Sequence, residues 1–145
     1  MKSNISSKDE LDKNSNLRYL SLEIFHKNKL FELVNQDYGY PVEMLIKKII
    51  CEKNHIHSYP PRTNKGCISP RYKTHDLNDL IKLSGLSCKV DNLRSNDFEF
   101  YKAWLKVCSW DVNNRYKIVG FNEETSEDYI KAVKKVIEEV RTWRV

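Results

Sequence analysis

Apolar residues recur along this chain at spacings of three, four and seven, the repeat that places side chains on one face of an α-helix. The clearest row follows Pro41, which suits a first helical position, and predicts a helix that reaches Ile50. The stretch from Leu17 to Val34 has no Gly or Pro and predicts a preceding helix. The apolar positions of these two helices are Leu17, Leu20, Ile24, Phe31 and Val34, then Val42, Leu45, Ile46, Ile49 and Ile50.

Three more helices are predicted in the second half of the chain. The first is short, because Thr74 is a candidate cap for the amide of Leu77 and Gly85 stops the helix. The second begins at Asn96 or Asp97 as its cap. The apolar row of the second helix is Phe98, Tyr101, Trp104, Leu105, Cys108 and Val112.

The last predicted helix follows Gly120, and Thr125 and Asp128 have the spacing of a capping box. Its apolar row is Ile130, Val133, Val136, Ile137, Val140 and Trp143. We therefore predict an all-α fold, an up-and-down bundle of four or five helices in residues 17–145. Residues 1–16 have few apolar side chains and are predicted to form a flexible arm.

Composition and charge restrict the function classes only slightly. No apolar run approaches the length of a membrane-spanning helix, and no apolar segment follows the first lysine, so we expect a cytoplasmic protein. The 25 Lys and Arg against 20 Asp and Glu give a net charge of +5, which is compatible with a polyanionic partner but assigns none. In a reducing compartment the cysteines are expected to be free thiols, namely Cys51, Cys67, Cys88 and Cys108.

Common catalytic and metal motifs are missing from the sequence. Cys51, His55, His57 and Cys67 are the ligand types that suit zinc, but they are not arranged in tight pairs. We therefore expect no metal there, only a core thiol and exposed imidazoles. The chain has no Gly-rich phosphate loop, GxSxG or HExxH, which sets aside the usual nucleotide-hydrolysing, serine-hydrolase and zincin classes.

The densest charge lies between predicted helices, in residues 52–75, which hold five basic residues and one acidic residue. Tyr59 and Tyr72 are interleaved with these charges. Lys and Arg that contact phosphates, beside tyrosines that stack on bases, are typical of single-stranded RNA binding. The alternative is a solvated loop. The candidate nucleic-acid or nucleotide contacts here are Arg62, Lys65, Arg71, Tyr72 and Lys73.

A second polar cluster follows the aromatic helix, at Asp111 to Tyr116. Arg115 has the geometry for bidentate phosphate binding, with Tyr116 beside it. The alternative is a simple ion pair between Arg115 and Asp111, which are four residues apart.

Several short motifs, in their order along the chain, resemble the HEPN family of small helical domains. They are Tyr38-Gly39-Tyr40-Pro41 leading into a Lys-bearing helix, a Pro-containing loop, Thr74-His75-Asp76-Leu77, Asn114-Arg115-Tyr116 and a last helix ending near Trp143. The resemblance covers about residues 17–145. It implies a helical bundle that dimerises, in either RNA-cleaving toxins or non-cleaving proteins that pair with a small nucleotidyltransferase.

The ribonuclease members of that family carry an Arg followed a few residues later by a His. Here Arg115 has no downstream His, and Arg71 precedes His75 by a shorter interval than the family motif. We therefore expect an accessory protein of a bacterial defence or toxin–antitoxin type system that binds RNA, a nucleotide or a partner protein without catalysis. The alternatives are a metal-independent endoribonuclease using Arg71, His75 and Arg115, and a structural protein-interaction module.

Two aromatic residues fall outside the apolar row of the predicted aromatic helix, namely Phe100 and Trp110. Large exposed aromatic side chains are favoured at interfaces. The sequence therefore predicts a homodimer that buries these two side chains between its subunits.

Overall fold

A computed structural model of the chain describes residues 5–62, 66 and 68–143, and the all-α class predicted from the sequence is confirmed. The α-helices are α1 (Lys8–Lys27), α2 (Phe31–Asp37), α3 (Tyr40–Lys53), α4 (Leu77–Ser84), α5 (Ser87–Asn96), α6 (Phe98–Cys108) and α7 (Glu123–Val140). Two short 3-10 helices are η1 (Pro70–Tyr72) and η2 (Val112–Tyr116). The strands β1 (Ser6–Ser7) and β2 (Ser58–Tyr59) pair antiparallel, with Ser6 opposite Tyr59.

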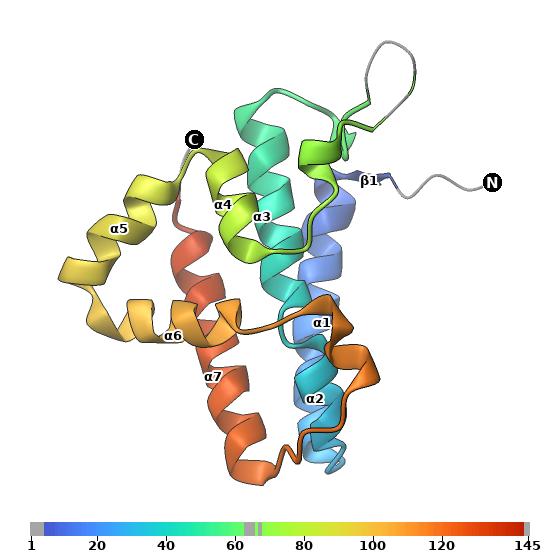
Figure 1. Cartoon of the computed structure of the whole chain (residues 1–145), viewed down its shortest axis with the longest axis vertical. Helices are drawn as coiled ribbons and strands as arrows, with labels where there is room; N and C mark the ends of the chain where they lie inside the picture. The colour runs from blue at the N-terminus through green and yellow to red at the C-terminus, as the bar shows by residue number, and fades with distance from the viewer. Residues whose placement is uncertain (1–4, 63–65, 67, 144–145) are drawn as a thin grey trace.

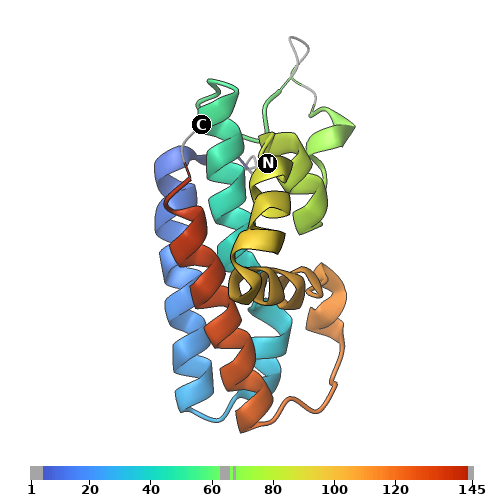
Figure 2. The ribbon, with the colours of Figure 1, turned by 90° about the vertical axis from the view of Figure 1, so that its left-hand side faces the viewer.

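Three long helices form the centre of the molecule. α1 runs down the view of Figure 1, and α3 and α7 both run up it. Figure 2 shows α1, α3 and α7 side by side, and each of the three contacts the other two. α4, α5 and α6 pack at one side of the three long helices, and α6 crosses α7 (Figure 1). The chain then returns to the lower end of the view before α7 begins, so α7 runs parallel to α3. The arrangement is therefore not a simple alternation of up and down helices.

α3 confirms the strongest sequence prediction. Pro41 lies at the start of the helix, where its missing N–H is not needed. The predicted apolar row is buried throughout, from Val42 at 0% exposure to Ile49 at 5%. α3 is the element against which the functional side chains described below are arranged.

The helix predicted over residues 17–34 is helical over most of that range, but its bounds and its continuity are wrong. α1 begins at Lys8, where Ser7 and Glu10 form a capping box, and it ends at Lys27 before a separate α2. The predicted flexible arm of residues 1–16 therefore contains two turns of packed helix, since Leu11 and Ser15 are buried. The start of the domain falls before residue 17.

The apolar row expected to face the core from α1 lies on the surface instead. Leu17, Leu20 and Ile24 are 61%, 52% and 58% exposed. The buried side of α1 is formed by Leu11, Ser15 and Leu22, and the Ser15 hydroxyl donates a hydrogen bond to the Pro41 carbonyl at 2.7 Å.

The aromatic residues assigned to a dimer seam are buried inside one chain. Phe100 is 0% exposed and packs against Trp104 and Trp143. Trp110 is 5% exposed, and its indole N–H donates to the Gln36 carbonyl at 3.0 Å. The prediction that they form an interface is therefore wrong. α6 buries Phe100, Ala103 and Val107, each of which lies one residue before a position of the expected row.

Helix caps in the second half differ in detail from the sequence predictions. Asp97 does cap α6, as predicted. α4 is capped by Asp76 rather than Thr74, and α7 by Asn122 rather than Thr125. α4 does stop at Gly85, which has a φ of 74°.

α5 was not predicted. Of its ten residues only Val90 is buried, so it lacks the apolar row that reveals a helix.

No helix in the described ranges is long and apolar enough to cross a bilayer.

Candidate functional site

A groove with a volume of about 350 Å³ lies between α3, the start of α1 and the connection from α3 to α4, which comprises residues 54–76 and includes β2. The connection leaves the top of α3 and returns across it to α4 (Figure 1). This return brings side chains far apart in the sequence over the first two turns of α3. The polar residues that line the groove are Ser6, Asn14, Glu43, Lys47, Tyr59, Tyr72, Lys73, Thr74 and His75.

The centre of the groove is a carboxylate–imidazole pair. Glu43 is 3% exposed, and its Oε1 lies 2.6 Å from Nδ1 of His75. An ionised carboxylate only accepts, so the His75 Nδ1–H donates this bond, and in a neutral ring the lone pair is then on Nε2. The His75 side chain is 51% exposed, so the ring is held on one edge and open on the other. Such a pair can bind a phosphate oxygen when protonated or accept a proton when neutral.

Burial of the Glu43 carboxylate requires partners, because an unpaired buried charge is very costly. Its other oxygen lies 3.6 Å from the ammonium of Lys47, one turn later on α3. Lys47 is itself largely buried, and its Nζ lies 5.0 Å from the centroid of the Tyr59 ring. The pair is thus supported by a cation and an aromatic wall.

The position of His75 is set by the start of α4. Asp76 caps the helix by accepting from the Asp79 amide at 3.0 Å. The Thr74 hydroxyl accepts from the Asp76 amide and donates to Asp79 Oδ2. Residues on both sides of His75 are therefore fixed by hydrogen bonds, which holds the imidazole against α3 before any ligand arrives.

Two tyrosines close the groove. The Tyr59 hydroxyl donates to the Tyr72 carbonyl at 2.9 Å, and the two rings meet edge to face at 5.8 Å. Burial raises the pKa of Tyr59 well above its usual value, and the nearby charge of Glu43 adds to the shift. Tyr59 is thus a neutral hydrogen-bond donor at physiological pH.

The predicted basic residues of the connection lie on two sides of it. Lys73 is exposed and lines the groove with His75. The Arg71 guanidinium lies 5.4 Å from the Tyr72 ring centroid and lines a neighbouring hollow that also contains Lys73 and Lys82. Arg71 and His75 are therefore close along the chain but face different hollows.

Arg115 and Tyr116 lie on η2, which packs against α2, where the Asn114 side-chain amide donates to the Asn35 carbonyl. Both are exposed, and the guanidinium lies 4.8 Å from the Tyr116 ring centroid. No ion pair joins Arg115 to Asp111 in the described structure, because Asp111 instead caps η2.

The charge of Arg115 reaches the first turn of α3. Burial raises the pKa of Tyr40, the charges of Asp37 and Glu43 raise it further, and Arg115 and Arg18 oppose the shift. Arg115 therefore acts on Tyr40, one turn before Glu43 on α3. No contact joins it to His75 among the described hydrogen bonds and ion pairs.

The remaining sequence candidates lie apart from the groove. Arg62 is exposed and donates to the Gly66 carbonyl at 2.9 Å, while Lys65 lies outside the described residues. His55 and His57 are exposed, as expected.

Cysteine positions give no metal site in the described part of the chain. Cys51 is buried, and burial raises the pKa of its thiol to about 11. Cys67 lies outside the described residues. Among those described, no group of three or more His, Cys, Asp or Glu is arranged to hold a metal ion.

Comparison of the chain with family models, curated proteins and solved structures gives no match. The HEPN resemblance therefore remains a prediction, and the site is interpreted from its own geometry.

Sequence reasoning selected His75, Lys73 and Tyr72 but missed Glu43 and Lys47. A signal was present, because Glu43 lies three residues before Ile46 and seven before Ile50, on the buried face of α3. A carboxylate on the apolar face of a strong helix needs a partner, and His75 is that partner.

Proposed function

We propose that the groove over Glu43 and His75 binds the phosphate backbone of single-stranded RNA, and that the protein is a HEPN-like accessory protein of a bacterial defence or toxin–antitoxin system. The observation that carries this proposal is the placement of His75, Lys47 and Lys73 along one groove. Three nitrogen donors in a row suit the spaced phosphates of a single strand.

The surroundings of the groove support a nucleic acid over a small neutral ligand. The Arg71 guanidinium lies 5.4 Å from the ring centroid of Tyr72, which lines the groove, and a second exposed pair, Arg115 and Tyr116, lies apart from the groove on η2. Exposed tyrosine rings and stacked guanidinium groups are the surfaces on which unpaired bases stack. A nucleotide contains the same phosphate and base, so it is expected to compete with RNA for this site.

The binding experiment uses a fluorescently labelled single-stranded RNA and measures affinity against salt. The double variant Lys47→Ala and Lys73→Ala, which removes the two lysines that line the groove, is expected to lower the slope of log affinity against log salt by about 1.4, at roughly 0.7 per phosphate contact. Lys134→Ala, on the exposed side of α7, is the matched control and should leave the slope unchanged. An unchanged slope in the double variant would leave the connection a solvated loop and favour a structural protein-interaction module.

Cleavage of RNA without a metal is the second candidate, favoured by the Glu43–His75 pair. In this reaction Nε2 of His75 accepts the proton of a ribose 2′-hydroxyl, and the 2′ oxygen attacks the adjacent phosphorus. The bond from phosphorus to the 5′ oxygen breaks, that oxygen takes a proton from water, and the imidazolium gives its proton to the hydroxide that remains. Glu43 holds the imidazole tautomer and stabilises its positive charge, and Lys47 and Lys73 are the nearest cations for the phosphate.

The two candidates separate in one assay, in which the protein is incubated with labelled RNA in a chelator. The binding proposal predicts intact RNA. Cleavage that disappears in His75→Ala and persists in His57→Ala, an exposed imidazole of the same connection, would instead establish the ribonuclease. Glu43→Gln should then reduce the rate, because it removes the charge that stabilises the imidazolium.

A further inference from the structure

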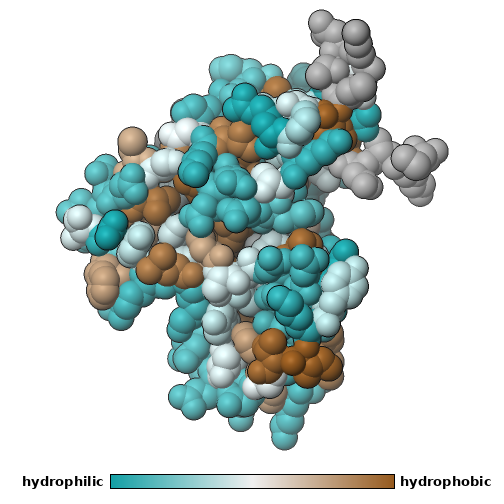
Figure 3. Space-filling model, viewed as in Figure 1, coloured by the Kyte–Doolittle hydropathy of each residue, from teal (hydrophilic) through white to brown (hydrophobic). Residues whose placement is uncertain are grey.

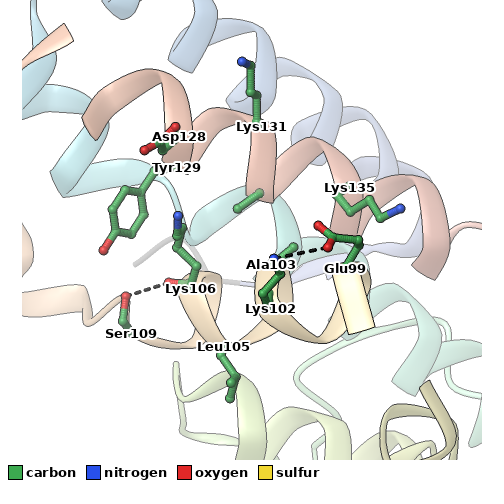
Figure 4. A pocket seen from close by; sticks show the side chains of 11 residues that line it. Glu99, Lys102, Ala103, Leu105, Lys106, Ser109, Asp128, Tyr129, Lys131 and Lys135 are labelled. Carbon is green, nitrogen blue, oxygen red and sulfur yellow. Dashed lines mark hydrogen bonds and ion pairs between the residues drawn. The ribbon is translucent and has the colours of Figure 1, made fainter. Parts of the chain in front are cut away.

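α6 crosses α7 and leaves an open groove with a volume of about 770 Å³. Its floor contains Ala103 and Ala132, which are 8% and 7% exposed. Small side chains at a helix crossing leave room for a third helix to approach closely. Figure 4 shows Lys106 extending from α6 toward Tyr129 of α7, so that a lysine and an aromatic ring close one end.

Lysines dominate the rim of this groove. Lys102 and Lys131 form exposed ion pairs with Glu99 and Glu127, each on the same helix. The other two, Lys106 and Lys135, form no ion pair with any residue in the described part of the chain. They come from different helices, so their charges flank the alanine floor (Figure 4).

We propose that this groove docks an acidic amphipathic α-helix of a partner protein. An apolar face of such a helix packs over the alanines and the alkyl stems of the lysines around them, and glutamates or aspartates on its flanks pair with Lys106 and Lys135. α6 has 11 residues and is about 16 Å long at 1.5 Å per residue, so it can support about three turns of a docked helix.

The geometry favours a protein helix over a nucleic acid in this groove. Tyr129 is its aromatic side chain, and the ring is already contacted by Lys106 at 5.5 Å, Tyr38 at 4.7 Å and Phe121 at 5.0 Å. A base would therefore find no free ring on which to stack, and the alanines offer it no side-chain hydrogen bond. Carbon-rich side chains of a helix, in contrast, match this floor.

This groove shares no residue with the groove over Glu43 and His75. The two proposals can therefore fail independently.

The test uses two synthetic peptides, each about four helical turns long and stapled to hold the helix. Both have leucines along one face, and the flanks carry glutamates in one peptide and lysines in the other. Fluorescence anisotropy with the full chain should give at least about tenfold tighter binding of the acidic peptide. The double variant Lys106→Glu and Lys135→Glu should reverse this preference, and Lys134→Glu, a neighbouring exposed lysine off the groove, should preserve it.

A second variant tests the floor without altering charge. Ala132→Leu should weaken the acidic peptide at least about tenfold, and circular dichroism should show that it remains helical. Equal affinity for both peptides, or no binding of the acidic one, would overturn the proposal. It would also be overturned if a labelled uridine oligonucleotide bound through Lys106 and Lys135, or if their reversal dissociated a dimer of the chain itself.

Discussion

Gly39 stands where the chain turns from α2 into α3, and its missing side chain makes room for Trp110. A methyl group at this position would overlap the indole ring of Trp110. The backbone itself does not require glycine, because φ is −82° and ψ is −21°, which alanine adopts freely. We therefore predict that Gly39→Ala destabilises the fold through this one contact.

The change in the free energy of unfolding has three contributions, of which two destabilise the variant and one stabilises it. Overpacking of a full core site costs about 1–3 kcal/mol. Displacement of Trp110 also endangers its hydrogen bond to the Gln36 carbonyl, worth about 1 kcal/mol. Replacement of glycine by alanine stabilises by about 0.4–1 kcal/mol through the unfolded chain. The net expected loss in the free energy of unfolding is about 1–3.6 kcal/mol.

Urea unfolding followed by circular dichroism measures this loss in two backgrounds. Trp110→Ala alone should cost about 3–5 kcal/mol, because it removes a buried aromatic side chain. In that background Gly39→Ala should no longer destabilise and should instead add about 0.4–1 kcal/mol of stability. If Gly39→Ala costs the same in both backgrounds, the contact with Trp110 is not the cause and the reasoning is refuted.

Three further outcomes are expected. At about pH 8.5, near the pKa of a free thiol, iodoacetamide should alkylate exposed Cys88 well before Cys108, because burial raises the pKa of Cys108 to about 12. Peptide mass spectrometry measures the two rates, and equal rates would contradict this expectation. The hydrogen bond from Arg141 lowers the pKa of Asp12, so ionised Asp12 stabilises the fold above about pH 4 and this is lost as pH falls through the lowered pKa. Arg141→Ala should thus cost under about 1 kcal/mol at neutral pH and less in acid, measured by urea unfolding, because the pair is partly exposed. The predicted homodimer now requires another seam, and the exposed row of Leu17, Leu20 and Ile24 on α1 is one exposed apolar surface of the described chain. If this row forms the seam, sedimentation should give a dimer that Leu20→Asp converts to monomer, and a monomeric parent chain would exclude it.

The sequence predicted α3 well and α1 poorly, for one physical reason. Every position of the predicted α3 row is aliphatic and buried, so the apolar pattern located the buried face of this helix, although it missed Glu43 there. On α1 the buried face includes Ser15, whose hydroxyl is satisfied by the Pro41 carbonyl. The more apolar row, which contains Leu17 and Leu20, faces outward. Periodicity reports apolar side chains, and a serine with a hydrogen-bond partner is invisible to it.

The sequence predicted the residues that the connection contributes to the groove, but not those that α3 contributes. Basic and aromatic residues of the connection are conspicuous in the sequence, and His75 was selected with them. Its partner Glu43 lies 32 residues away on another element, and only the return of the connection over α3 brings the two together. A charge on a helix is ordinarily taken as solvated, so its burial depended on tertiary contacts that the sequence pattern does not contain.

On the face seen in Figure 3, apolar areas lie among larger polar ones, with one broader apolar area near the lower end, but this balance depends on α7. α7 contacts α1, α2, α3 and α6, and Val133 and Val136 are fully buried in those contacts. During synthesis α1, α2, α3 and α6 all leave the ribosome before α7, which covers part of each of them. The apolar faces that α7 covers therefore stay open in the nascent chain until Glu123–Val140 emerges, and exposed apolar surface of this kind favours aggregation.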